Sequence, residues 1–79
     1  MEIEIEEKLQ EKYKNLIIEV NFKDFGLYEI IIRLEYQGIQ YESKFEYKYD
    51  ASLTIDANLS TIVHIIDTHI ILPFYKKGE

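Results

Sequence analysis

The middle of this sequence alternates apolar and polar residues in three successive runs, and this pattern constrains the fold more than any other feature. A period of two is typical of β-strands that bury one face and expose the other. The runs cover residues 16–22, 28–36 and 39–49, with turn-forming residues between them at 23–26 and 37–38. Three strands joined by turns this short predict an antiparallel sheet.

The second turn predicts how the second and third strands pair, because a two-residue loop at Gln37-Gly38 fixes the hairpin register. This register places Leu34 beside Tyr41 and Ile30 beside Phe45, so the apolar residues of both strands share one face. The polar residues of both strands then share the opposite face.

The first turn must keep Phe22 and Tyr28 on the same face of the sheet. Since side chains alternate along a strand, this requires an odd number of loop residues. We expect a three- or five-residue loop in which Gly26 adopts a positive φ.

Helical periodicity flanks the three strands. Residues 3–15 carry Ile5, Leu9 and Tyr13 on one helical face, with glutamates before lysines as the helix dipole favours. The alternation of residues 2–6 also allows a short edge strand there. A second helix is predicted to begin about Asp56 and to end or kink at Pro73. Its apolar stripe consists of Leu59, Ile62, Val63, Ile66 and Ile70.

These elements predict a single α+β domain over residues 1–79, with two layers and the order αβββα. A chain this small uses most of its apolar residues for its own core, so the helices should pack on one face of the three-stranded antiparallel sheet. We expect Tyr28, Tyr36, Tyr41 and Tyr47 to pack under the helices with their hydroxyls at the rim. The predicted buried sheet face consists of Ile18, Val20, Ile30, Ile32, Leu34, Tyr41 and Phe45.

Composition limits the functions open to this chain. Fifteen acidic residues stand against nine basic ones, for a formal net charge of -6, which disfavours direct binding to nucleic acid despite seven tyrosines. No cysteine is present, so disulfides and thiolate chemistry are excluded. No apolar run approaches the roughly 18 residues that span a bilayer, and the acidic start does not resemble a secretory signal. We therefore expect a cytoplasmic protein without membrane association.

Residues with catalytic potential do not assemble into a convincing site. Ser60, His64 and Asp67 share one helical face, but a serine within a regular helix lacks free backbone N–H groups for an oxyanion hole. His64 and His69 are five residues apart and point in different directions, so they cannot chelate one metal ion. We predict no catalytic residue, no cofactor and no metal site, and we interpret Lys23-Asp24-Phe25-Gly26 as a turn.

The polar face of the sheet is the predicted partner-binding surface. On it Arg33 faces Glu42 favourably, whereas Glu29 faces Glu46, a repulsion that the diagonal Lys44 and Lys48 can relieve. Exposed aliphatic residues surrounded by charge are typical of a modest protein-binding patch, and Ile17 and Ile31 fit that description. The predicted binding residues are Glu19, Glu29, Ile31, Glu35, Glu42 and Glu46. The acidic N-terminal helix is the alternative binding surface.

One segment resembles a known family. The sequence Ile31-Ile32-Arg33-Leu34, followed by Gly38 and Tyr41 and placed between an early and a late helix, is similar to the small acidic anti-CRISPR inhibitors of phages and prophages. The resemblance implies an inhibitor that presents carboxylates where a nuclease would hold DNA phosphates. It therefore implies a basic host-defence nuclease as the partner.

The sequence thus predicts a non-catalytic protein-binding module, a small acidic inhibitor or regulator that docks on a basic, nucleic-acid-handling protein. The alternative is a homo-oligomeric structural or accessory domain. It would form a homodimer through the edge of the first strand or through the patch with Ile17 and Ile31.

Overall fold

The computed structural model describes residues 2–73 and confirms the predicted αβββα order. A meander of three antiparallel strands, in the spatial order β1-β2-β3, forms the sheet. The last element, η1, is a turn of π-helix that continues α2, so helical conformation extends to Pro73. The elements are α1 (Glu2–Lys12), β1 (Ile17–Asp24), β2 (Leu27–Tyr36), β3 (Ile39–Lys48), α2 (Ile55–Ile66) and η1 (Asp67–Ile71).

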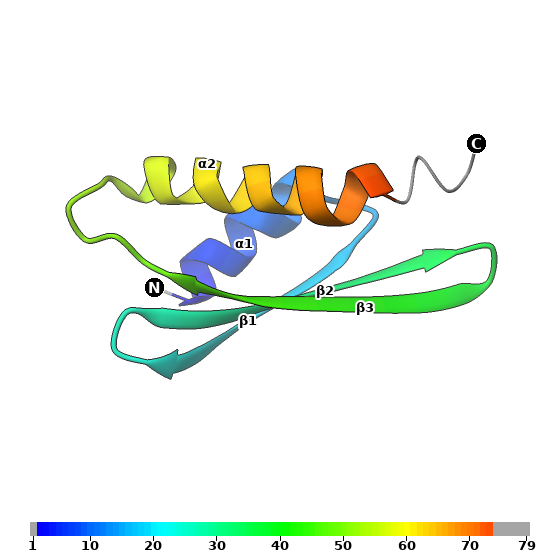
Figure 1. Ribbon diagram of the computed structural model, residues 1–79, viewed down its shortest axis with the longest axis horizontal. Helices are drawn as coiled ribbons and strands as arrows, with labels where there is room; N and C mark the ends of the chain where they lie inside the picture. Colours follow the sequence, from blue (N-terminus) through cyan, green and yellow to red (C-terminus); the bar gives the residue numbers. More distant parts are fainter. Residues whose placement is uncertain (1, 74–79) are drawn as a thin grey trace.

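Both helices lie on the same side of the sheet, which confirms the two-layer arrangement (Figure 1). The molecule is elongated, with extents of 40 × 19 × 18 Å, and α2 runs along its length above the strands (Figure 1). Residues 2–7 belong to α1, so the alternative of an N-terminal edge strand is wrong. Ile5 and Leu9, on the predicted helical face, are buried against the sheet side of the core.

The second hairpin has the predicted register. Leu34 pairs with Tyr41 and Ile30 with Phe45, as the two-residue loop requires. Gln37 and Gly38 have φ values of 53° and 78°. Two consecutive positive φ values are characteristic of the type I′ turn, whose twist matches that of the flanking strands.

The first hairpin confirms that Phe22 and Tyr28 share one face of the sheet, but its loop is shorter than the predicted three or five residues. Phe22 pairs with Tyr28, so the two lie on the same face as predicted, yet Asp24 also pairs with Leu27, so only Phe25 and Gly26 form the loop. The register shifts by an irregularity between Phe22 and Asp24. This shift, rather than a loop with an odd number of residues, keeps Phe22 and Tyr28 on the same face. Gly26 has the predicted positive φ, at 75°.

The core joins the sheet to both helices, and it differs from the prediction near the second hairpin. Ile18, Val20, Ile30 and Ile32 are buried as expected. Tyr41, in contrast, is 37% exposed, and Leu34, Tyr36 and Phe45 are only partly buried. The β2–β3 hairpin extends beyond the described end of the helical layer, which explains the weaker cover near its tip (Figure 1). Further buried residues are Leu16, Tyr28, Tyr47, Ile62, Ile66 and Ile70.

A buried amide joins β3 to α2. Asn58 is fully buried, and its Oδ1 accepts hydrogen bonds from the Tyr47 hydroxyl at 2.7 Å and from the Asp50 N–H at 2.9 Å. Its Nδ2 donates to the carbonyl oxygens of Asp50 at 3.0 Å and Thr54 at 2.9 Å. Thr54 also caps α2 by accepting the Ala57 N–H at 3.1 Å. One side chain thus satisfies four polar partners and fixes the loop between β3 and α2.

Candidate functional site

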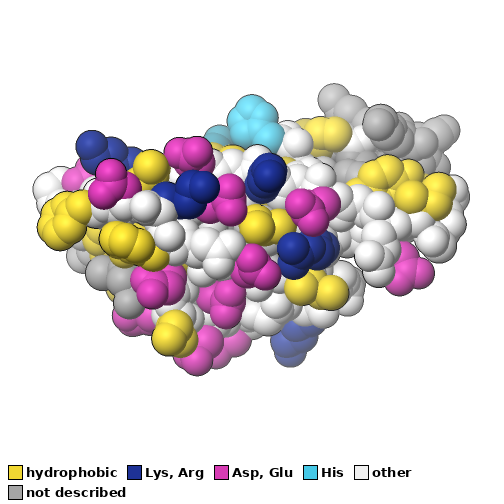
Figure 2. Space-filling model, turned by 90° about the horizontal axis from the view of Figure 1, so that it is seen from below, with side chains coloured by type: hydrophobic (Ala, Val, Ile, Leu, Met, Phe, Trp, Pro, Cys, Tyr) yellow, Lys and Arg dark blue, Asp and Glu magenta, His cyan; other side chains and the backbone are white. Residues whose placement is uncertain are grey.

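The sheet face opposite the helices carries most of the predicted binding residues. Acidic side chains are spread over this side of the molecule, with lysine and arginine side chains between them (Figure 2). The strand register explains the mixture, because β3 alternates Glu42, Lys44, Glu46 and Lys48 along this face. The face is therefore a charge mosaic rather than a uniformly acidic surface.

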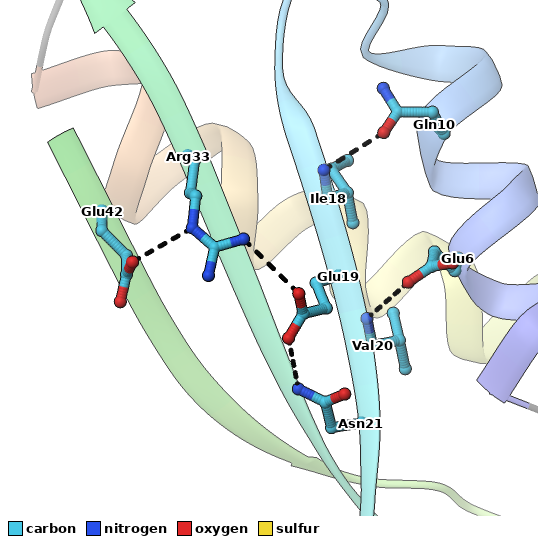
Figure 3. Close-up of polar contacts among 8 residues, drawn as sticks. All are labelled: Glu6, Gln10, Ile18, Glu19, Val20, Asn21, Arg33 and Glu42. Atoms are coloured by element: carbon cyan, nitrogen blue, oxygen red, sulfur yellow. Dashed lines mark hydrogen bonds and ion pairs between the residues drawn. The ribbon is translucent and has the colours of Figure 1, made fainter. Parts of the chain in front are cut away.

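Arg33 lies at the centre of this mosaic and bridges all three strands. Its Nε donates to Glu42 Oε2 at 3.1 Å, which confirms the predicted cross-strand pair, and its Nη1 lies 3.5 Å from Glu19 Oε1 (Figure 3). Glu19 also accepts a hydrogen bond from Asn21 Nδ2 at 2.8 Å. One guanidinium thus contacts two of the five predicted binding glutamates, and its single positive charge offsets one of their two negative charges.

These contacts favour the charged forms of the groups involved. The hydrogen bond from Asn21, followed by the one from Arg33, lowers the pKa of Glu19 below its usual value. The hydrogen bond to Glu42 raises the pKa of Arg33. Glu19 and Arg33 therefore stay ionised at neutral pH, and a docking partner would have to compete with Arg33 for the Glu19 carboxylate.

The repulsion between Glu29 and Glu46 is relieved by a different lysine from the two that were predicted. Glu29 does face Glu46 across the β2–β3 ladder, but Lys23 of β1 forms the ion pair, at 3.7 Å between Nζ and Oε2. The Glu29 side chain is only 20% exposed. Glu35 and Glu46, in contrast, are exposed and form no ion pair within residues 2–73.

The two aliphatic residues of this face have different environments. Ile17 is 61% exposed, as predicted, but Ile31 is only 8% exposed, so the prediction that it is part of an exposed patch is wrong. Ile31 occupies the central strand, with Glu19 of β1 and Lys44 of β3 as its cross-strand neighbours. The apolar centre of the predicted docking patch is therefore reduced to Ile17.

A second acidic surface lies on α1. Glu4, Glu7 and Glu11 are all exposed, and their spacing places them on the outward side of the helix. Ile3, 67% exposed, lies beside them. The sequence predicted the acidic N-terminal helix as the alternative binding surface, but it did not single out these three residues, although the i, i+3, i+7 spacing was readable. We call Glu4, Glu7 and Glu11 the α1 acidic stripe.

The inner side of α1 lies along the outer edge of β1. The Ile18 N–H donates to Gln10 Oε1 at 3.1 Å, and the Val20 N–H donates to Glu6 Oε1 at 3.0 Å (Figure 3). Gln10 Nε2 also donates to the carbonyl oxygen of Leu16 at 2.6 Å. These bonds occupy backbone groups that a neighbouring strand would need. They speak against dimerisation through the edge of the first strand.

The serine, histidine and aspartate of α2 and η1 do not form a catalytic arrangement. Ser60, His64 and Asp67 are exposed, and the Asp67 Oδ1 accepts a hydrogen bond from the Tyr13 hydroxyl at 2.6 Å. Asp67 thus links α1 to the end of the helical layer instead of orienting a histidine. No group of three metal-binding side chains occurs within residues 2–73.

The Tyr13–Asp67 contact predicts a specific response to alkaline pH. Burial, together with the hydrogen bond and negative charge of Asp67, raises the pKa of Tyr13 above its usual value near 10. A group with a raised folded-state pKa contributes stability that is complete below the unfolded pKa and is lost as the pH rises through the folded one. Replacing Tyr13 with phenylalanine should therefore lower stability at neutral pH by about 1 kcal/mol.

The same replacement should make the loss of stability above about pH 10 less steep than in the parent. Thermal denaturation from neutral to alkaline pH would measure both effects. Tyr28 and Tyr47, whose pKa values are also raised by burial, should maintain part of the alkaline loss in the variant. Parallel pH profiles for the variant and the parent would contradict the assigned contact.

Comparisons with protein-family models, with curated proteins and with solved structures give no match to this chain. Neither helix within residues 2–73 combines the length and apolar character needed to cross a bilayer.

Proposed function

We propose that this chain is a cytoplasmic, non-catalytic binding module that docks through carboxylates on a basic, nucleic-acid-handling protein. The observation that carries the proposal is a set of exposed glutamates without an ion-pair partner among the described residues. Three belong to the α1 acidic stripe and two to the open sheet face. They are Glu4, Glu7, Glu11, Glu35 and Glu46.

The charge distribution favours α1 as the main contact surface. Residues 2–12 contain five glutamates and two lysines, whereas the centre of the sheet face is balanced by Arg33 and two lysines of β3. Unpaired carboxylates can form new charge-assisted contacts without first breaking old ones. The exposed Ile3 adds an apolar contact beside the stripe.

The sheet face would contribute a secondary contact near Glu35. A shallow depression of about 160 Å³ lies there, with apolar side chains, one carboxylate and one guanidinium on its walls. The apolar wall suits the aliphatic stem of an arginine or lysine side chain, whose charged end would lie at Glu35 and away from Arg33. The depression is lined by Asn15, Ile17, Arg33, Leu34, Glu35 and Gln40.

The negative charge of these exposed carboxylates favours a basic partner that handles nucleic acid. Carboxylates arranged on a small rigid domain attract the surfaces that otherwise bind phosphates. In its narrower form, suggested by the hairpin resemblance, the proposal is that the partner is a CRISPR nuclease and that the chain is an anti-CRISPR inhibitor. The wider proposal requires only that docking and nucleic-acid binding exclude each other.

The proposal can be tested by measuring DNA cleavage by purified CRISPR nuclease–guide complexes in the presence of increasing amounts of the full chain. Inhibition should weaken as salt is raised, because the contacts are mainly electrostatic. In parallel, immobilised chain should retain basic nucleic-acid-binding proteins from the native host, and added double-stranded DNA should release them. Failure to inhibit any nuclease would remove only the narrower form, whereas retention that DNA does not affect would refute both.

Replacing Glu4, Glu7 and Glu11 together with glutamine should weaken docking by about tenfold or more. Glutamine has nearly the helix propensity of glutamate, so the fold should be preserved. Glu19→Gln is a control on the sheet face that removes one charge where the triple variant removes three, at a carboxylate that Arg33 already engages. Equal losses of affinity in the control and in the triple variant would place the docking surface on the sheet instead.

A further inference from the structure

The two edges of the sheet differ in how their backbone groups are used. At the β1 edge, side chains of α1 accept the N–H groups of Ile18 and Val20. At the β3 edge, no side chain or backbone group within residues 2–73 bonds the outward-facing groups of the strand. β3 therefore presents a ten-residue edge that can accept another strand.

The hairpin geometry identifies which residues of β3 face outward. In a type I′ hairpin the closing pair, Tyr36 and Ile39, exchanges hydrogen bonds across the two strands. The direction of backbone groups alternates along an antiparallel strand, so the outward-facing groups belong to the even-numbered residues. These are Gln40, Glu42, Lys44, Glu46 and Lys48, whose side chains lie on the open sheet face.

The side chains of this edge are complementary to themselves. Charges on an edge strand commonly prevent pairing, but they do so best when they have one sign. Here the signs alternate along the strand, as Glu42, Lys44, Glu46 and Lys48. An antiparallel second copy can therefore be placed so that every one of these charges meets its opposite.

We propose that β3 pairs in antiparallel fashion with β3 of a second copy of this chain, with Glu42 facing Lys48 and Lys44 facing Glu46. The two-fold axis then passes beside Phe45, which meets its own copy on the helix side of the sheet. The result is a continuous six-stranded sheet with the helices of both protomers on one face. Each opposite-charge pair occurs twice, because the interface is symmetric.

The charge pattern selects this register over its neighbour. A shift by one pairing step places Lys44 against its own copy and Glu42 against Glu46, so that like charges meet at these pairs, while Lys48 faces the neutral Gln40. The proposed register also keeps the outward-facing groups of both strands opposite each other, as an antiparallel ladder requires. The α1 acidic stripe takes no part in the interface and stays available for docking in the dimer. Glu46 is the one proposed docking carboxylate that the interface uses, because it pairs there with Lys44 of the second copy.

The test is sedimentation of the full 79-residue chain over a range of concentrations. The measured mass of a dimer is twice the 9.5 kDa mass of one chain. Lys44→Glu alone and Glu46→Lys alone should each weaken dimerisation at least tenfold, because each creates two like-charge contacts. An equimolar mixture of the two variants should restore a dimer, since the heterodimer again sets opposite charges against each other. Circular dichroism of each variant checks the fold.

Two control variants make the same changes of net charge away from the edge. Lys8→Glu on α1 matches Lys44→Glu, and Glu35→Lys on β2 matches Glu46→Lys; both residues are exposed. Neither control should alter the dimer. A chain that remains monomeric at every concentration overturns the proposal, and so does a dimer that the β3 variants do not weaken.

Amide hydrogen exchange of the unmodified chain provides a readout that requires no variant. The N–H groups of Glu42, Lys44 and Glu46 should exchange rapidly in dilute samples and become protected as the concentration rises. The N–H groups of Ser43 and Phe45, which face β2, should be protected at all concentrations. Rapid exchange at the three outward-facing positions in a dimeric sample would contradict pairing through β3.

Discussion

Replacing Ile66 with alanine is expected to lower the free energy of unfolding by about 2 to 5 kcal/mol. Ile66 is fully buried on the inner face of α2, and removing its side-chain carbons leaves a cavity that the surrounding core fills only in part. Ile32→Ala should have an effect of similar size, since Ile32 is 1% exposed on the central strand. A domain of this size has little stability to spare, so much of the population could unfold.

Urea denaturation of the parent and both variants measures this effect through the shift of the transition midpoint. Ile17→Ala is the matched control, because Ile17 is 61% exposed on the opposite face of the sheet. Its stability should change by about 0.5 kcal/mol at most. Ile66→Ala and Ile32→Ala variants with the parent's midpoint would show that the assigned core is wrong.

The parts of the fold that follow from local pattern were predictable from sequence. The period of two set the strands, and the Gln37-Gly38 loop alone determined the register of β2 and β3. From that register the Arg33–Glu42 contact followed as well. These features depend on residues close in sequence, so tertiary structure adds little to them.

The features that depend on several elements at once were not predictable. The irregularity before Asp24 sets the register of β1, and this register brings Glu19 within reach of Arg33. The burial of Ile31 depends on its position in the central strand, with a neighbouring strand on each side. The contacts of Gln10 with β1 require the angle at which α1 crosses the sheet, which no local pattern encodes.

In the candidate site, too, some features were predictable from local sequence and others depend on several elements at once. Sequence reasoning placed five glutamates on the open sheet face, and the pairing along each strand determined which of them kept an available charge. Glu35 and Glu46 did, whereas Glu19 and Glu42 are engaged by Arg33 and Glu29 by Lys23. The acidic N-terminal helix was the alternative surface predicted from sequence, and the exposed side of α1 in the structure identifies Glu4, Glu7 and Glu11 as its acidic stripe.

Asn58→Asp should destabilise the protein by about 3 to 5 kcal/mol at neutral pH, although the two side chains have nearly the same shape. The Asn58 amide donates to the carbonyl oxygens of Asp50 and Thr54. A carboxylate in its place loses both bonds and sets negative charge against two carbonyl oxygens in a fully buried position. Asn15→Asp is the matched control, because Asn15 is exposed, and it should change stability by about 0.5 kcal/mol at most.

The pH dependence of Asn58→Asp distinguishes this cause from a loss of packing. Burial raises the folded-state pKa of the introduced carboxyl above its unfolded value near 4, because it disfavours the charged form. Relative to the parent, the variant should therefore be most stable below that unfolded value and lose stability as the pH rises through the folded one. Urea midpoints measured from acidic to neutral pH would show the parent and variant converging at low pH. A deficit that is constant with pH would mean that lost packing, rather than a buried charge, causes the destabilisation.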